Sequence, residues 1–402
     1  MELPNASARL YLKPGHDRPV RRHHPWIFSG AMGRLEGPVE DGGLVEVFTF
    51  QGEWLARGYL NRRSQILVRL LTWDPQEPID VSFWRQRLER AAQARQALRL
   101  EERTTAYRLV FAESDGLPGL IVDRYNDFLV LQSLTLGIER WKPFLVRLLQ
   151  EQFQPRGIYE RSDVEVREKE GLPPRCGLLT GDAPPDRLII SEHGLRFYVD
   201  LRRGHKTGFY LDQRENRQRA AAYLNGAEEV LNAFSYTGAF AVYALAAGAR
   251  QVVNVDTSRE ALQLALENIR LNGFDPGRVE NVEGDAFQML RRFAAVGRRF
   301  DAVILDPPKF AYAQAHLNRA ARGYKDINLQ ALRLIRPGGL LITFSCSGLV
   351  SLELFQKIVF AAAEDAGREV QILEKLSQGP DHPIRLSFPE SEYLKGLIGR
   401  VW

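Results

Sequence analysis

The stretch EVLNAFSYTGAFAVYALAAGARQVVNVDTS, residues 229–258, carries the most information about the fold of this chain. An apolar strand runs into a turn that contains Gly238, an alanine-rich helix follows, and a second apolar strand ends at Asp256. Apolar strands separated by helices are typical of a parallel sheet that is covered by helices on both faces. We therefore expect this region to be part of a doubly wound α/β sheet.

The same alternation of strands and helices continues towards the C-terminus. Amphipathic spacing predicts helices over 259–273 and near 316–335. Apolar runs predict strands at RFDAVILD (299–306) and GGLLITFSC (338–346). We therefore assign residues 191–402 to one α/β domain.

The first half of the chain follows a different pattern. Short strands and turns fill residues 9–73 and predict a small β-barrel, so we assign residues 1–76 to a first domain. Helical spacing in VSFWRQRLERAAQARQALRL (81–100) predicts a helix that leads out of the barrel. Strands mixed with an amphipathic helix near 140–153 predict a central α+β domain, residues 77–190.

Composition restricts the class of protein. The chain has 402 residues, of which 45% are hydrophobic and 26% charged, as in globular proteins of several domains. It lacks an apolar run of roughly 18 residues and a signal-peptide pattern at its start, so we expect a cytoplasmic protein with no membrane partner. Two cysteines are too few for a disulfide framework or a four-cysteine zinc site, and we expect no metal.

The basic charge is concentrated at the front of the chain. The formal net charge is +4, and the first hundred residues hold 15 Lys and Arg against 11 Asp and Glu. A basic excess is compatible with a polyanionic partner but does not require one. We therefore expect the N-terminal part to face such a partner.

Polar residues follow the ends of successive predicted strands, where an open α/β sheet binds its ligand. Gly238 allows a tight turn and a close approach of the next helix N-terminus to a ligand. Asp256, 18 residues further on, is placed to accept a hydrogen bond from a ribose hydroxyl, and Asp285 is placed to accept one from an adenine amino group. Asp306 ends the fourth strand ahead of two prolines, which lack N–H donors. The residues expected around the ligand are Phe234, Ser235, Tyr236, Thr237, Gly238, Asp256, Thr257, Ser258, Asp285, Ala286, Asp306 and Pro307.

Each of these residues also has an ordinary structural interpretation. Asp256, Ser258 and Asp285 precede helices and would serve as N-caps in any protein. A series of four strand ends that carry such groups is far less expected by chance, and together they resemble the class I S-adenosylmethionine-dependent methyltransferases. That resemblance implies S-adenosylmethionine as the cofactor. A nicotinamide dehydrogenase would more often show G-x-G-x-x-G, which is missing from the chain.

Cys346 follows the fifth strand, at the same sheet edge as Asp306. A small buried thiol is the commoner fate of a free cysteine. A nucleophile at this place would share a cleft with the methyl donor, and thiolate addition at carbon 6 of cytosine would make carbon 5 able to accept a methyl group. Asp306 could stabilise the activated ring. Lys309 is a candidate for the positive neighbour that a thiolate needs, and it could equally contact RNA phosphate.

Longer strings identify a resemblance to a more specific family. FSYTGAFAV, VDTSREAL, DPPKF, ARGYKDIN, FSCSGL and DHP, with HHPWIFSGA, GEWLARGYL, ESDGLPGL and GHKTGFYLDQREN, look like the bacterial 23S ribosomal RNA cytosine-5 methyltransferases over almost the whole chain. The resemblance implies an N-terminal PUA domain, a central α+β domain and a C-terminal Rossmann-like catalytic domain. It also implies that Cys346 is the nucleophile and Asp306 the fourth-strand aspartate. Where many RNA cytosine-5 methyltransferases carry a second cysteine, this chain has Lys309.

Further contacts are expected from the same resemblance. GHKTGFYLDQR, residues 204–214, lies beside the cofactor pocket in the family, although a solvated hairpin is an equal interpretation of this polar stretch. Gln213 is thus a candidate cofactor ligand. The implied partner is 23S ribosomal RNA, and a homodimer is left open. The candidate RNA contacts are Arg21, Arg22, His24, Lys206, Arg214 and Lys309.

Two other functions remain open from the sequence. The first is methylation of another base or of a small molecule, with Cys346 inert; a related guanine-N7 methyltransferase shares the cofactor half and lacks the cysteine. The second is a non-catalytic RNA-binding or assembly factor that uses the barrel. The modified cytosine and the base that removes the carbon 5 proton are not identified by the sequence.

Overall fold

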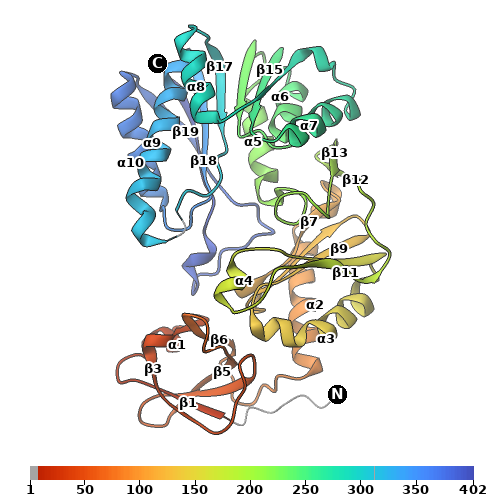
Figure 1. Cartoon of the computed structure of the whole chain (residues 1–402), viewed down its shortest axis with the longest axis vertical. Coiled ribbons are helices and arrows are strands. Elements are labelled where there is room, and N and C mark those ends of the chain that lie inside the picture. Colours follow the sequence, from red (N-terminus) through yellow and green to blue (C-terminus); the bar gives the residue numbers. More distant parts are fainter. Residues whose placement is uncertain (1–7, 312) are drawn as a thin grey trace. The chain divides into compact units, whose positions relative to one another are not determined.

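The computed structural model describes residues 8–311 and 313–402, and many of its helices and strands are labelled in Figure 1. The chain forms two compact units. The first unit comprises the chain up to Ile190 together with Val199–Leu211 and Pro380–Ser391. The second unit comprises Ser191–Tyr198, Asp212–Gly379 and Glu392–Trp402. The predicted domains 1–76, 77–190 and 191–402 are a finer division, which stays a prediction.

The first unit begins with a sheet in which the strands follow the order β2-β6-β5-β4-β1-β3. β1 pairs parallel with β4, and the other neighbours pair antiparallel. Apolar residues of these strands fill a separate core, which includes Leu10, Val47 and Val68. The strands are β1 (Ala8–Leu12), β2 (Trp26–Phe28), β3 (Met32–Glu36), β4 (Leu44–Phe48), β5 (Trp54–Leu60) and β6 (Ile66–Thr72), and the short helix α1 is Arg18–Arg21.

A second sheet of this unit has the order β11-β10-β9-β8-β7 and packs against two helices, as the mixed pattern predicts. Asp80 caps the first of these helices and Thr135 caps the second. The elements are α2 (Val81–Ala97), β7 (Ala106–Phe111), β8 (Leu120–Tyr125), β9 (Phe128–Ser133), α3 (Leu136–Phe153), β10 (Gly157–Ser162), α4 (Val166–Lys169) and β11 (Arg175–Gly181).

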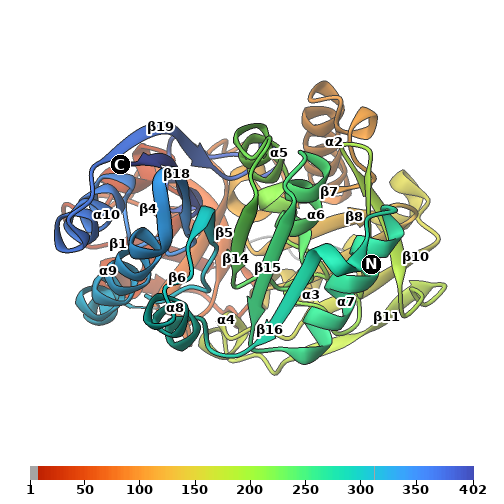
Figure 2. The same ribbon diagram turned by 90° about the horizontal axis from the view of Figure 1, so that it is seen from above.

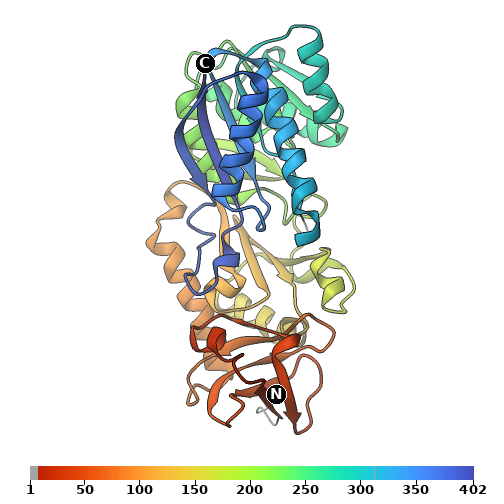
Figure 3. The same cartoon turned by 90° about the vertical axis from the view of Figure 1, so that its left-hand side faces the viewer.

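Buried polar contacts tie the parts of the first unit together. Arg69 of β6 forms an ion pair of 2.8 Å with Glu170, and both side chains are buried. The segment Pro380–Ser391 joins this unit although it comes from near the C-terminus (Figure 3). Its buried Asp381 accepts a hydrogen bond from the backbone N–H of Arg108 at 2.9 Å. The two sheets of the unit therefore share buried ionic contacts as well as apolar ones.

The second unit is built on a sheet of order β16-β15-β14-β17-β18-β20-β19, which confirms the predicted doubly wound α/β class. The strands β16, β15, β14, β17 and β18 are parallel, and β20 runs antiparallel between β18 and β19. The strands are β14 (Glu229–Ala233), β15 (Gln251–Asp256), β16 (Val279–Glu283), β17 (Phe300–Leu305), β18 (Ile335–Ser345), β19 (Val370–Ser377) and β20 (Lys395–Val401). A separate pair, β12 (Leu188–Glu192) and β13 (Leu195–Val199), precedes this sheet in the chain.

Helices cover both faces of this sheet (Figure 2). α5, α6 and α7 pack in a row on one face, and α8, α9 and α10 pack in a row on the other. The predicted helices over 259–273 and near 316–335 are observed as α7 and α9. The helices are α5 (Arg214–Tyr223), α6 (Ala239–Ala246), α7 (Arg259–Leu271), α8 (Ala286–Ala295), α9 (Leu317–Leu334) and α10 (Leu352–Ala366). Within the residues that the structure describes, no helix has the length and hydropathy to cross a membrane.

Candidate active site

The loop between β14 and α6 has an unusual backbone. Phe234, Tyr236 and Gly238 all have positive φ, at 60°, 46° and 73°. A Cβ atom at Gly238 would lie 2.7 Å from the Cβ of Ala265 in α7, so a larger residue would push α6 and α7 apart. Positive φ at two residues other than glycine costs free energy and often marks a functional loop. The predicted role of Gly238 in a tight turn is therefore matched by the geometry.

Asp256 ties this loop to the end of β15. Its Oδ2 accepts a hydrogen bond from the backbone N–H of Tyr236 at 2.7 Å, and its Oδ1 accepts one from Ser258 at 2.9 Å. Ser258 and Asp285 cap α7 and α8 by accepting from Ala261 and Gln288, each at 3.1 Å. The capping interpretation of these residues is correct, and it leaves them at the sheet edge where ligand contacts were predicted. Thr257 is exposed and Ala286 is buried at the same edge.

Two hydroxyl groups in the loop have unsatisfied hydrogen-bonding capacity. Ser235 Oγ and Thr237 Oγ1 are buried and have no hydrogen-bond partner among the described residues. A buried hydroxyl without a partner costs free energy, so such groups are rare unless a water or a ligand completes them. The loop is therefore suited to a polar ligand with several donors and acceptors.

Asp306 and Gln213 meet although 93 residues separate them in the sequence. Gln213 Nε2 donates to Asp306 Oδ1 at 3.0 Å, and Asn216 Nδ2 donates to Gln213 Oε1 at 2.6 Å. Asp306 directly follows β17, and the prolines after it cannot extend the strand. The structure thus brings together two residues that were predicted separately, one from the strand-end pattern and one from the family resemblance.

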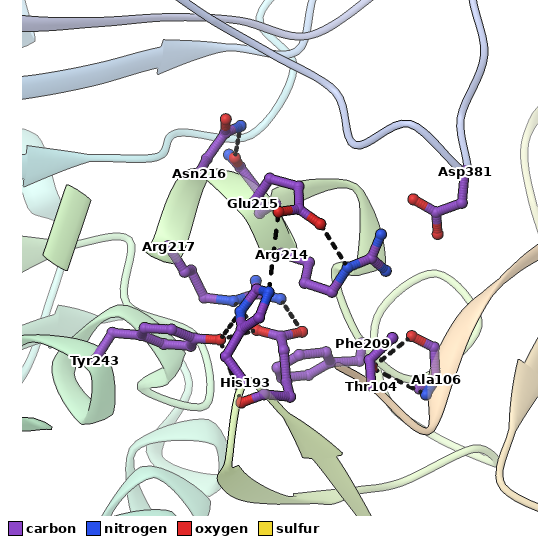
Figure 4. A network of polar contacts seen from close by, with 12 residues as sticks. Thr104, Ala106, His193, Phe209, Arg214, Glu215, Asn216, Arg217, Tyr243 and Asp381 are labelled. Atoms are coloured by element: carbon purple, nitrogen blue, oxygen red, sulfur yellow. Dashed lines mark hydrogen bonds and ion pairs between the residues drawn. The ribbon is translucent and has the colours of Figure 1, made fainter. Parts of the chain in front are cut away.

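A buried ionic network holds the helix that follows Gln213. Arg217 of α5 donates from Nε and from a terminal nitrogen to the two carboxylate oxygens of Glu192, each at 2.7 Å. Tyr243 of α6 donates to the same carboxylate at 2.9 Å and contacts His193 Nδ1 at 2.8 Å (Figure 4). Burial and the Glu192 carboxylate together raise the pKa of Tyr243 far above its usual range. Because α5 begins one residue after Gln213, this network sets the position of the Gln213 side chain.

Cys346 lies beside the two prolines. Its Sγ donates to the carbonyl oxygen of Pro307 at 3.8 Å, and the residue is only half-buried. Its neighbours Ser345 and Ser347 are fully buried, and Ser347 Oγ is 3.0 Å from the hydroxyl of Tyr324. The fully buried thiol of the alternative interpretation is therefore not observed. The sulfur lies next to the residue that follows Asp306.

Aromatic side chains gather at this edge around Phe234, and three of them, Phe287, Phe310 and Tyr324, were not predicted from the sequence. The ring of Phe287 is 6.4 Å from that of Phe234 and 5.8 Å from that of Phe310, and Phe310 is 4.6 Å from Tyr324. Phe287 and Phe310 each follow a predicted acceptor within four residues, in the strings GDAF and DPPKF. That position was a usable signal, because residues just beyond a strand end point to the same edge of the sheet.

Lys395 is a further residue near Cys346 that was not predicted from the sequence. It begins β20, lies opposite Ser345 of β18, and is 2% exposed. Its Nζ donates to the carbonyl oxygen of Ser347, the residue after Cys346, at 3.2 Å. Because β20 comes from a distant part of the sequence, spacing around Cys346 could not have revealed this contact.

The predicted RNA contacts near the N-terminus, Arg21, Arg22 and His24, lie in the first unit. Arg21 pairs with Asp17 at 2.6 Å and also with Glu53, whereas Arg22 is exposed. His24 is half-buried and lies 3.3 Å from Glu390. Arg22 is therefore better placed than Arg21 or His24 to reach a phosphate group.

The other predicted RNA contacts differ in exposure. Lys206 is exposed and lies over the ring of Tyr210 at 4.5 Å, and Lys309 is also exposed. Arg214 is fully buried, and its Nε donates to Glu215 at 3.2 Å. This burial argues against direct RNA binding by Arg214. The polar stretch 204–214 is also no simple hairpin, since it runs into a short 3-10 helix and then α5.

Comparisons with known proteins agree with this geometry. The family profile described as S-adenosylmethionine-dependent methyltransferase matches residues 167–387, and a PUA-like domain profile matches residues 10–73. Relatives from Shewanella amazonensis and Aeromonas hydrophila, both named ribosomal RNA large subunit methyltransferase I, are each 51% identical over 98% of this chain and 100% of their own.

Solved structures share the fold over nearly the full length. A protein of Streptococcus mutans, described as a candidate S-adenosylmethionine-dependent methyltransferase, superposes with a TM-score of 0.85 at 22% identity over 98% of this chain and 99% of its own. The methyltransferase profile covers more than half of the chain, and the curated relatives match it almost completely. With the strand-end residues and the partnerless hydroxyls of the loop, these matches show that the chain belongs to the S-adenosylmethionine-dependent methyltransferase family, with S-adenosylmethionine as its cofactor.

Proposed function

We propose that this protein methylates carbon 5 of a cytosine in 23S ribosomal RNA and that Cys346 is the nucleophile. The relatives that match the whole chain are named for large-subunit ribosomal RNA. The observation that carries the cytosine-5 assignment is the position of Cys346, half-buried with its sulfur 3.8 Å from the carbonyl oxygen of Pro307, beside Asp306. A thiol is required for methylation at carbon 5 and has no role in methylation at a ring nitrogen.

The proposed reaction returns the thiol to its starting state. The Cys346 thiolate forms a bond to carbon 6, and the electron pair of the ring's 5,6 double bond then becomes available at carbon 5. Carbon 5 would take its methyl group from the sulfonium of the cofactor, whose sulfur would keep the electron pair of the broken bond and leave as a neutral thioether, and a base removes the proton from the same carbon. The electrons of that C–H bond restore the double bond while the bond from sulfur to carbon 6 breaks. Asp306, adjacent to the sulfur's hydrogen-bond partner, is proposed to stabilise the ring during these steps.

The residues at the strand ends are proposed to hold the cofactor. The buried hydroxyl groups of Ser235 and Thr237 have no hydrogen-bond partner among the described residues. The cofactor would supply these partners. The acidic Asp256 would accept from the ribose, and Asp285 from the adenine. When bound, S-adenosylmethionine supplies the methyl group from its sulfonium centre. The further proposed contacts are Phe234, Tyr236, Gly238, Thr257, Ser258, Ala286, Pro307 and Gln213.

The RNA is proposed to contact basic residues that the structure leaves exposed. Arg22 lies in the part that matches a PUA-like domain, and Lys206 and Lys309 are exposed elsewhere in the chain. Positive groups near RNA release counterions from the phosphates, so we expect binding that weakens with salt. The division into domains 1–76, 77–190 and 191–402 is part of this proposal.

Nucleoside mass spectrometry tests the proposed function. The purified protein and S-adenosylmethionine are incubated with 23S ribosomal RNA from cells that lack the gene, and the RNA is digested to nucleosides. We expect one new 5-methylcytosine. A new 7-methylguanosine would overturn the assignment and favour the guanine-N7 alternative. RNA binding without any methylated product would favour an assembly factor.

A substitution at Gly238 tests the cofactor loop. We expect Gly238→Ala to weaken S-adenosylmethionine binding by about tenfold or more, since the new Cβ combines a left-handed φ, which costs about 1 to 2 kcal/mol, with a 2.7 Å approach to Ala265. Isothermal titration calorimetry measures the affinity. Gly273→Ala is the matched control, because Gly273 has a φ of 75° and open space around it. Wild-type affinity in Gly238→Ala would show that the loop does not hold the cofactor.

A further inference from the structure

Lys395 is a buried cation at the start of β20. The residue is 2% exposed and pairs across the sheet with Ser345, the residue before Cys346. Burial of an ammonium group costs several kcal/mol unless nearby groups compensate it, so buried lysines are rare and need a physical reason. The proposed function above assigns no task to this residue.

The ammonium group is held by backbone oxygens. Its Nζ donates to the carbonyl oxygens of Ser347 and Tyr393, both at 3.2 Å, and of Glu392 at 3.4 Å. These contacts use the three donors of the group. Within residues 8–311 and 313–402, Lys395 forms no ion pair with a carboxylate. Among the described residues, the positive charge of Lys395 is therefore compensated by backbone carbonyl dipoles and not by a carboxylate.

The charged groups that face Lys395 are few. Burial lowers the pKa of Lys395, the exposed carboxylate of Glu392 and a thiolate at Cys346 raise it, and the exposed Lys309 lowers it. The interaction between two charges is mutual, so a positive Lys395 and a thiolate at Cys346 would stabilise each other. Glu392 is exposed, so water screens its charge more than that of the half-buried sulfur.

We propose that Lys395 is a positioning residue for Cys346, whose ammonium group fixes the turn after the cysteine and is the counter-charge of its thiolate. The hydrogen bond to Ser347 holds the backbone on one side of Cys346, and the strand pairing at Ser345 holds it on the other. This inference deepens the proposed function, because it rests on Cys346 being the attacking group.

Lys309, the cation expected from the sequence, is less suited to this task. It is exposed, whereas Lys395 is almost completely buried. An exposed charge acts through water and salt, which weaken its effect on a neighbouring thiol. Substitution of Lys395 can therefore be compared with the same substitution of Lys309.

The test measures the pKa of the Cys346 thiol directly. In a Cys176→Ser background, the rate of alkylation by iodoacetamide is followed against pH, so that Cys346 is the only thiol that reacts. We expect a midpoint below the value of about 8.5 for an unperturbed cysteine. Lys395→Met should raise the midpoint by about one pH unit or more, and Lys309→Met should raise it less than half as far.

Lys395→Arg keeps the positive charge and should leave the midpoint near the wild-type value. The acidic limb of the pH profile of kcat/KM should move with the thiol midpoint in each variant. Melting temperature and S-adenosylmethionine binding show whether each variant is folded. If Lys395→Met does not fold, Lys395→Gln, which keeps N–H donors for the same carbonyl oxygens but lacks the charge, is measured in its place with the same expected rise in midpoint.

Two results would overturn the inference: a wild-type midpoint at or above about 8.5, or a folded Lys395→Met with an unchanged midpoint. Alkylation does not depend on methyl transfer, so the two proposals can fail separately. A lowered thiol pKa in a protein whose Cys346→Ala variant stays active would reject the proposed function alone. An inactive Cys346→Ala variant with a Lys395-independent thiol pKa would reject this inference alone.

Discussion

Cys346→Ala is expected to reduce the rate of RNA methylation by at least about a thousandfold. Without a thiolate, carbon 5 of cytosine is too weak a nucleophile to take a methyl group, and among the described residues the variant has no other thiol at this sheet edge. The other cysteine, Cys176, lies in β11 of the first unit. Transfer of a radiolabelled methyl group to 23S ribosomal RNA measures the rate.

The affinity for S-adenosylmethionine shows whether Cys346→Ala loses activity because the thiol is missing or because the site is distorted. The Cys346 side chain donates to the Pro307 carbonyl, and alanine leaves this oxygen without a weak donor. We therefore expect S-adenosylmethionine affinity to change by less than about threefold while the rate falls. Cys176→Ser is the matched control and should retain full activity, because Cys176 is exposed. Full turnover in Cys346→Ala would mean that the target atom is not carbon 5 of a pyrimidine.

Glu192→Ala is expected to lower the free energy of unfolding by about 3 to 5 kcal/mol. The substitution leaves the guanidinium of Arg217 buried without its carboxylate, and it also removes the acceptor of the Tyr243 hydroxyl. Loss of the carboxylate from a buried ion pair is among the most destabilising changes in a protein interior. Urea denaturation, followed by circular dichroism, measures the loss.

An exposed ion pair provides the control for this substitution. Glu228 pairs with Arg250 at 3.1 Å, with side chains that are 67% and 75% exposed. Glu228→Ala should therefore change the free energy of unfolding by less than about 1 kcal/mol. If Glu192→Ala were as stable as Glu228→Ala, the buried network would not be what holds α5. In that case the position of Gln213 would need another explanation.

Several features of the site were predictable because they depend on neighbours along the chain. Gly238, Asp256, Asp285 and Asp306 were selected because each follows an apolar strand, and parallel strands place their carboxyl ends at one edge. Cys346 was found in the same way. The structure confirms the doubly wound sheet from which these positions were inferred.

The surroundings of individual side chains could not be predicted from the sequence. Arg214 looked like an exposed basic residue in a polar stretch, but it is fully buried. Lys309 was a candidate for the positive neighbour of Cys346 and stays one, but the buried Lys395 of β20, which donates to the residue after the cysteine, was not predicted. Neither outcome is visible in a local pattern, since burial depends on which distant segments pack together.

The amino-acid pattern alone was thus sufficient for the α/β class, for the strands at 229–233, 251–256, 299–306 and 338–346 with the helices that follow 238, 258 and 316, and for the residues at those strand ends; it did not predict α5, α8, α10, β19 or β20. These features arise from hydrophobic periodicity and turn chemistry, which act over a few residues. The contacts Gln213–Asp306, Glu192–Arg217 and Ser347–Lys395 join residues that are 25 to 93 positions apart, and folding had to bring them together. The electrostatic environment and the burial of a side chain depend on that packing, so they could be determined only from the three-dimensional structure.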